Sequence, residues 1–101
     1  MLMSRQSRRG ARKEEYVNAI PHKSEKALLV SLADKVHNAS AILSDYTLIG
    51  EELWSRFSGG REGTLWYYRA LTDAFRDRAP LVLWQRLEDT VSALESRAAA
   101  I

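Results

Sequence analysis

The sequence predicts an all-α fold of four to five helices. Apolar residues recur at the 3.6-residue spacing of helices over several stretches of the chain. Helix-breaking residues separate these stretches, namely Gly50, the glycine-rich segment 58–63 and Pro80. No stretch of useful length alternates between apolar and polar residues, as a strand would. These observations together indicate helices joined by short connections.

The first half of the chain predicts two helices. A short helix over residues 11–20 should end before Pro21, because the residue that precedes a proline avoids the α region. Ser24 then stands at the N-cap position of a long helix that reaches residue 44 or 46. One side of this helix carries an apolar stripe, which predicts its core face: Leu28, Leu29, Leu32, Val36, Ala39 and Leu43.

The second half predicts three more helices, over residues 51–57, 64–78 and 81–97. Segment 58–63 is interpreted as a plain connector, because it lacks the Gly-Lys-Ser/Thr ending of a phosphate-binding loop and follows no strand. Pro80 stops the helix before it. The expected core positions of the last two helices are Tyr67, Tyr68, Ala70, Leu71, Ala74, Phe75, Trp84, Leu87, Val91 and Leu94.

Composition points to one small globular domain. The chain has 101 residues, of which 46% are hydrophobic and 28% charged. Because there is no cysteine, disulfide frameworks, zinc-thiolate sites and thiol nucleophiles are excluded. The sequence has no apolar run of bilayer-spanning length and no signal-peptide core at its start. We therefore expect a soluble, cytoplasmic protein with no membrane partner.

The charge is distributed unevenly. Residues 1–13 hold five basic residues and no acidic one, whereas residues 14–101 hold ten basic and thirteen acidic residues. We interpret residues 1–13 as a basic mobile arm and residues 14–101 as a single helical domain. Nucleic-acid contact by the arm is an alternative to a solvated terminus, but the arm lacks interleaved aromatic residues, so we do not expect a nucleic-acid partner.

The long helix has an unusual second face. Ala27, Val30, Asn38 and Ala41 point in nearly the same direction as Asp34. A carboxylate among small and apolar neighbours predicts a helix covered on two sides, with Asp34 turned inward. Such a group needs a metal ion or a basic side chain as a partner, because an isolated buried charge is costly. The alternative is an ordinary helix carboxylate paired with a nearby Lys or Arg.

Several motifs of the chain are similar to a known family. The run Leu28–Ala39, LLVSLADKVHNA, resembles a signature of HD-domain phosphohydrolases of the RelA/SpoT type. The segments Arg12–Tyr16, Leu53–Phe57, Gly60–Gly63 and Leu65–Arg69 resemble the small single-domain branch of that family. The resemblance covers roughly residues 12–97. It is most specific where Ala-Asp-Lys-x-His-Asn is followed by the downstream Trp-Tyr-Tyr-Arg run.

The resemblance implies a fold, a cofactor and a substrate. Such enzymes hold one divalent ion, usually manganese, in an all-helical fold, and they remove pyrophosphate from the 3′ position of guanosine tetra- or pentaphosphate. By resemblance, Asp34 matches the last metal ligand, and Asn38 matches a residue lining the nucleotide site. Tyr67 matches a pocket tyrosine of the small relatives, and core packing is its alternative role.

The chain departs from the family at the metal ligands. His22 is followed by Lys23 and His37 by Asn38, so the sequence has no His-Asp pair. The resemblance therefore covers only the second half of an HD domain and implies a truncated phosphohydrolase that is inactive alone. The alternative is a non-catalytic helical module that forms a homo-oligomer or binds a complementing helical chain through an uncovered apolar face.

Overall fold

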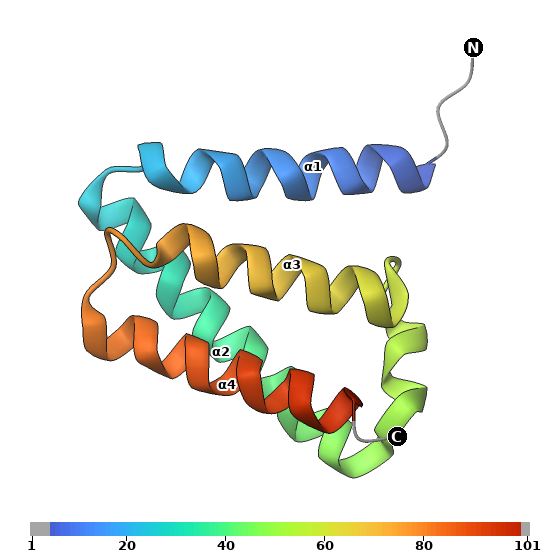
Figure 1. The fold of residues 1–101 in the computed structure, drawn as a ribbon. Coiled ribbons are helices and arrows are strands. Elements are labelled where there is room, and N and C mark those ends of the chain that lie inside the picture. Colours follow the sequence, from blue (N-terminus) through green and yellow to red (C-terminus); the bar gives the residue numbers. More distant parts are fainter. Residues whose placement is uncertain (1–4, 100–101) are drawn as a thin grey trace.

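The computed structural model describes residues 5–99, which form four α-helices and two 3₁₀ helices and contain no strand (Figure 1). In chain order the elements are α1 (Arg5–Ala19), η1 (Ile20–His22), α2 (Glu25–Ile49), η2 (Gly50–Arg56), α3 (Gly60–Phe75) and α4 (Leu81–Ala99). The expected all-α fold of four to five helices is confirmed. None of the helices in this part of the chain is both long and apolar enough to span a bilayer.

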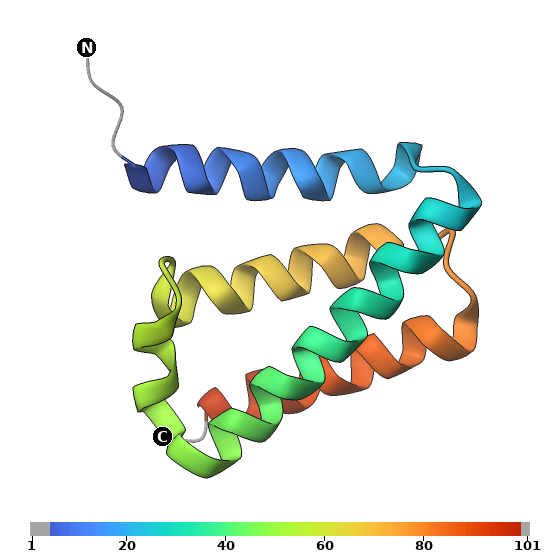
Figure 2. The same ribbon diagram turned by 180° about the vertical axis from the view of Figure 1, so that it is seen from behind.

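The helices form a thin slab that measures 41 × 36 × 17 Å. α1 packs on α3, and α3 packs on α4, so these three helices lie side by side. α2 packs chiefly on α4 and crosses it diagonally. Figure 2 shows that, among residues 5–99, no other element lies over the outer side of α2. One broad side of the longest helix therefore faces solvent.

Local sequence signals set the ends of α2 and the start of α4. The Ser24 side chain accepts a hydrogen bond from the Ala27 amide at 3.2 Å, as an N-cap does. Gly50, with φ 65°, ends α2 in a conformation that favours glycine. α4 begins directly after Pro80, whose carbonyl accepts from the Trp84 amide at 2.9 Å. The predicted cap and break are confirmed, although α2 continues to Ile49, past the expected end at residue 44 or 46. Pro80 separates α3 from α4, but α3 ends before it, at Phe75.

The core lies where α2, α3 and α4 meet. Leu32, Phe75 and Leu87 are completely buried there, one from each helix. Trp84 fixes a further contact, since its indole N–H donates to the Thr72 carbonyl at 2.8 Å. Most of the expected core positions are confirmed, because the fully or nearly fully buried apolar residues of these helices include Leu28, Ala39, Tyr68, Leu71, Val91 and Leu94.

Leu29 is an exception among the expected core positions, since 46% of its surface is exposed. The buried line of α2 runs through Leu28, Leu32, Ala39, Ile42 and Tyr46. Leu29 lies about 100° around the helix from Leu28. It therefore faces the open space beside the α3–α4 connection instead of the core.

An ion-pair network fixes α3 against α4. The Arg69 guanidinium lies 2.8 Å from Glu88 Oε1 and 2.8 Å from Glu95 Oε1. Ser92 donates a hydrogen bond to Glu88 from the next turn of α4. The pairing of Arg69 across the helix interface was not predicted from the sequence.

Helix α1 begins earlier than expected. It starts at Arg5 instead of residue 11, so the backbone of the expected basic arm is helical from Arg5 onward. The physical reason is that arginine, lysine, glutamine and alanine all favour helix, and Gly10 alone opposes it. The part of the expected mobile arm that precedes Arg5 lies outside the described residues.

The expected connector 58–63 is shorter than predicted. α3 begins at Gly60 and ends at Phe75, not at residues 64 and 78. Glycine costs about 1 kcal/mol in a helix interior, but Arg61 offsets this with a contact that the sequence does not reveal. Its guanidinium donates to the Ala98 carbonyl of α4 at 3.3 Å. The predicted helix over residues 51–57 is the 3₁₀ helix η2.

Candidate functional site

Asp34 lies on the surface of α2, and 57% of its side chain is exposed. The expectation that it turns inward on a helix covered on two sides is therefore wrong for the described residues. Its neighbours on the same face, Ala27, Val30 and Ala41, are exposed as well. The cause is tertiary: the helices present in residues 5–99 cover only one side of α2.

Two side chains of α2 contact the Asp34 carboxylate. The Asn38 amide donates to Asp34 Oδ2 at 3.4 Å from one turn away. The Lys35 ammonium lies 3.5 Å from the same oxygen, and only 14% of the Lys35 side chain is exposed. The expected proximity of Asp34 and Asn38 is present. Lys35 is the basic partner that the alternative interpretation of Asp34 required.

Lysines and tyrosines of three elements gather beside Asp34. The Lys35 ammonium lies 4.8 Å from the ring centre of Tyr16 and 5.9 Å from that of Tyr67. Lys13 lies 5.2 Å from the Tyr67 ring, and Lys23 lies 5.2 Å from the Tyr16 ring. These contacts connect α1, the segment between η1 and α2, the middle of α2, and α3. Each lysine thus has an aromatic face as a partner for its charge.

The Asp34 carboxylate is one of the groups that raise the pKa of two tyrosines of α3. Burial raises the pKa of Tyr67, and the nearby Tyr16 and Asp34 raise it further. Burial also raises the pKa of Tyr68 to about 12, with smaller contributions from Tyr67 and Asp34. Both phenols are therefore neutral and hydrogen-bond capable at neutral pH. We name the group Lys13, Tyr16, Asp34, Lys35, Asn38 and Tyr67 the Asp34 cluster.

Tyr67 lies at the edge of the core, so its position agrees in part with both predicted roles, core packing and a pocket residue. It is half-buried, whereas Tyr68 is a core residue with 7% exposure. The Tyr67 ring stacks on the exposed Trp66, with ring centres 6.3 Å apart. One edge of Tyr67 therefore borders the core and the other borders the Asp34 cluster, so packing does not exclude contact with a ligand.

The residues present do not fit a complete manganese site. Among residues 5–99, no three His, Cys, Asp or Glu side chains gather closely enough to hold a metal ion. Asp34 and Asn38 supply oxygen ligands from one helix, but the Lys35 ammonium already occupies the same carboxylate. A cation bound there would have to displace that lysine. Hard divalent ions need more oxygen or imidazole ligands than this face provides.

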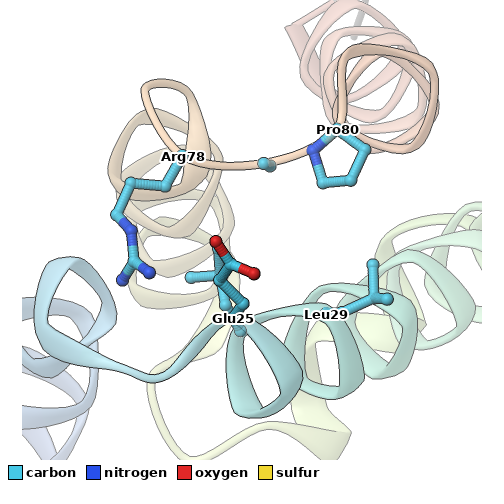
Figure 3. Close-up of a pocket in the computed structure, with 6 residues that line it drawn as sticks. Glu25, Leu29, Arg78 and Pro80 are labelled. Atoms are coloured by element: carbon cyan, nitrogen blue, oxygen red, sulfur yellow. The ribbon is translucent and has the colours of Figure 1, made fainter.

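A pocket lies away from the Asp34 cluster. It has a volume of about 420 Å³ and lies where the α3–α4 connection faces the start of α2 (Figure 3). Glu25, Leu29 and Pro80 line it, and Arg78 closes one side. The Arg78 guanidinium donates to the carbonyls of Pro21 and Lys23, which ties the two connections together. We interpret this region as a structural joint.

Sequence reasoning missed three members of the cluster. Lys13 was assigned to the arm, Tyr16 appeared only in a segment that resembles the family, and Lys35 was given no role. The available signal was the resemblance of Arg12–Tyr16 to the family, which predicts that this segment begins the helix before the motif helix. Spacing along the chain gave no such signal, because the contacts join residues of separate helices.

No protein-family model and no curated protein matches this chain. The relationship to HD-domain phosphohydrolases therefore rests on the motifs of the sequence and remains a proposal.

Proposed function

We propose that the chain is the second half of an HD-type nucleotide phosphohydrolase domain and that it is inactive alone. In this proposal the Asp34 cluster forms one wall of a site for a guanosine polyphosphate. Complementing helices, from elsewhere in a longer chain or from a separate chain, supply the His and His-Asp ligands. The observation that carries the proposal is that Asp34 and Asn38, from one motif, lie close to Tyr67, which comes from another.

The charges of the cluster support an anionic ligand. Lys13 and Lys35 hold their ammonium groups over Tyr67, and both are half-buried. Such cations attract phosphate oxygens more strongly than fully solvated ones do, because the local dielectric is lower. Trp66, which is 46% exposed, offers an aromatic face next to Tyr67. A phosphorylated nucleoside matches this combination of positive charge and stacking surface.

The flat shape of the chain supports the requirement for a second half. The Asp34 side of α2 has no covering element among residues 5–99. In the complete domain, the missing ligands would converge on Asp34 from that side. This chain's own contribution is then to position a carboxylate with Asn38 and to provide the lysines that neutralise phosphate charge.

The proposal can be tested by paramagnetic nuclear magnetic resonance with manganese. At millimolar Mn²⁺ we expect weak binding, with the strongest line broadening at the amides around Asp34. Asp34→Asn should remove this broadening. Asp89→Asn is the matched control, because Asp89 is also an exposed helix carboxylate, with an amide partner from Gln85. Broadening centred elsewhere would count against Asp34 as a metal ligand.

Activity provides the second test. The pure chain with Mn²⁺ and guanosine tetraphosphate should show no pyrophosphate release. Fusion to a helical segment that carries the His and His-Asp ligands should produce activity, and Asp34→Asn should abolish it. Turnover by the unfused chain would refute the claim that it is incomplete. A fused, folded domain that remains inactive would refute the phosphohydrolase assignment.

A further inference from the structure

The pocket between the α3–α4 connection and the start of α2 combines apolar surface with two opposite charges (Figure 3). Leu28, Leu29 and Pro80 supply apolar surface, and Glu25 and Arg78 supply the charges. The volume of about 420 Å³ lies within the range of small-molecule sites, roughly 300–1,000 Å³. We name it the Glu25–Arg78 pocket. Its size and its mixed lining are those of a site for a small molecule.

The Glu25 carboxylate is available to a ligand. Figure 3 shows it pointing into the pocket, between Arg78 and Pro80. Within residues 5–99 it forms no ion pair, not even with Arg78 on the neighbouring wall. A carboxylate accepts several hydrogen bonds, and an ammonium group donates three. The counterpart of Glu25 in this pocket is therefore a ligand ammonium.

The Arg78 guanidinium is held in place by the backbone. Its Nη1 donates to the carbonyls of Pro21, at 3.0 Å, and of Lys23. Its Nε and Nη2 donate to no group of residues 5–99. A guanidinium binds a carboxylate best through two adjacent N–H groups, and these two nitrogens supply such a pair. Arg78 therefore offers the pocket a carboxylate-binding group whose position is already fixed.

The two charges together select the class of ligand. A ligand with only an ammonium group would be repelled by Arg78, and one with only a carboxylate would be repelled by Glu25. A zwitterion places each of its charges beside the opposite one. Leu29, which is 46% exposed in this chain, offers apolar contact to the rest of such a molecule. The pocket is thus complementary to a small zwitterion with an apolar body.

We propose that the Glu25–Arg78 pocket binds a small zwitterion with an apolar side chain, of the kind represented by a free apolar α-amino acid. The ammonium contacts Glu25, the carboxylate contacts Arg78, and the side chain packs on Leu29 and Pro80. Both charged residues are exposed to solvent, so the dissociation constant is on the order of millimolar. The site lies apart from the Asp34 cluster and does not depend on the proposed phosphohydrolase role.

Nuclear magnetic resonance with L-phenylalanine tests the proposal, because the aromatic ring shifts the resonances of nearby nuclei strongly. At tens of millimolar we expect saturable shifts centred on the amides of Glu25, Leu29 and Ala79. N-acetyl-phenylalanine, which lacks the ammonium, and phenylalaninamide, which lacks the carboxylate, should each bind several-fold more weakly. Glycine, which keeps both charges but has no apolar side chain, should also bind several-fold more weakly.

Substitutions assign each end of the ligand to one residue. Glu25→Gln should remove the preference for phenylalanine over its N-acetyl form, and Arg78→Gln should remove the preference over its amide. The matched controls are Glu62→Gln, at an exposed acid in the first turn of α3, and Arg56→Gln, beyond the far end of α2. Both controls should leave the two preferences unchanged.

Leu29→Ser tests the apolar contact and leaves the hydrogen bonds of Arg78 to the backbone in place. It should weaken phenylalanine binding several-fold and leave glycine binding unchanged. This variant is informative even if Arg78→Gln unfolds the chain, because Arg78 also ties two connections together. Helical circular dichroism checks that each variant remains folded.

Two outcomes would overturn the proposal. One is the absence of saturable shifts around the pocket at tens of millimolar phenylalanine. The other is equal binding of phenylalanine, its N-acetyl form and its amide, which would mean that Glu25 and Arg78 do not recognise the ligand charges. Either result leaves the manganese and activity tests of the Asp34 cluster unaffected, so failure of the two proposals can be distinguished.

Discussion

The two sides of α3 differ in how completely their charges are satisfied within the chain. Toward α4, Arg69 meets Glu88 and Glu95 across a closed interface that covers buried leucines and Phe75. Toward α1 and α2, the largely buried Lys35 pairs with the exposed Asp34 beside Tyr67. On the α4 side, the charged groups of the helix interface are paired with one another. The other side retains unused hydrogen-bonding and charge capacity, which is a property of ligand sites more than of cores.

One helix therefore contributes to the closed interface with one face and to the proposed ligand site with the other. Arg69 and Tyr67 are two residues apart on α3 and therefore point to different sides. Substitutions on the α4 side should change folding, whereas substitutions on the Asp34 side should change ligand binding with little effect on folding.

The largest expected effect is on the closed side. Phe75→Ala should destabilise the chain by about 3–5 kcal/mol, because it removes a completely buried aromatic ring and leaves a cavity. A domain of this size has only a few kcal/mol of stability, so complete unfolding of the variant at 25 °C also agrees with the prediction. Urea denaturation followed by circular dichroism measures it. Val82→Ala, at a position that is 76% exposed, should change stability by less than about 0.5 kcal/mol.

Arg69→Met should cost about 2 kcal/mol, since it leaves Glu88 and Glu95 without their shared cation. A double-mutant cycle with Glu88→Gln isolates the pairwise energy. If Lys35→Met, on the Asp34 side, destabilised the chain more than Arg69→Met, the proposed difference between the two sides of α3 would be wrong.

The same network predicts a pH dependence. The hydrogen bond from Arg69, together with that from Ser92, lowers the pKa of Glu88 below its ordinary value. As the pH falls, the unfolded chain therefore takes up this proton before the folded chain does. The contribution of Glu88 is complete above its unfolded pKa of about 4.3 and is lost as the pH falls through the lower folded pKa. Between pH 5 and pH 3, wild type should lose more thermal stability than Glu88→Gln.

The smallest effect is expected at Asp34. Asp34→Asn should change stability by less than about 0.5 kcal/mol, because the side chain is 57% exposed. Removing its negative charge should nevertheless lower the pKa of Tyr67 slightly, since Asp34 is one of the groups that raise it. Burial is the larger cause and persists in the variant. Titration of the tyrosine carbon resonances measures this pKa. An unchanged pKa of Tyr67 would show that Asp34 does not influence it.

Much of the fold follows from local signals. The Ser24 cap and the Gly50 break depend on backbone chemistry within a few residues, and both were predicted. The end of α3 at Phe75, before Pro80, was not. Nor were the starts of α1 and α3. The start of α3 includes glycines that a local rule assigns to a loop, and the contact from Arg61 to the end of α4 stabilises it as helix.

In the candidate site, too, some features follow from the sequence and others only from the packing of the helices. The sequence by itself determined that Asp34 and Asn38 lie one turn apart on a helix, because helical periodicity fixes such neighbours. Only the tertiary structure decided that Lys13, Tyr16 and Tyr67 join them, and that Asp34 faces solvent instead of a core. The physical reason is that periodicity specifies the direction of a side chain around its own helix, whereas the helices packed nearby determine what occupies that direction.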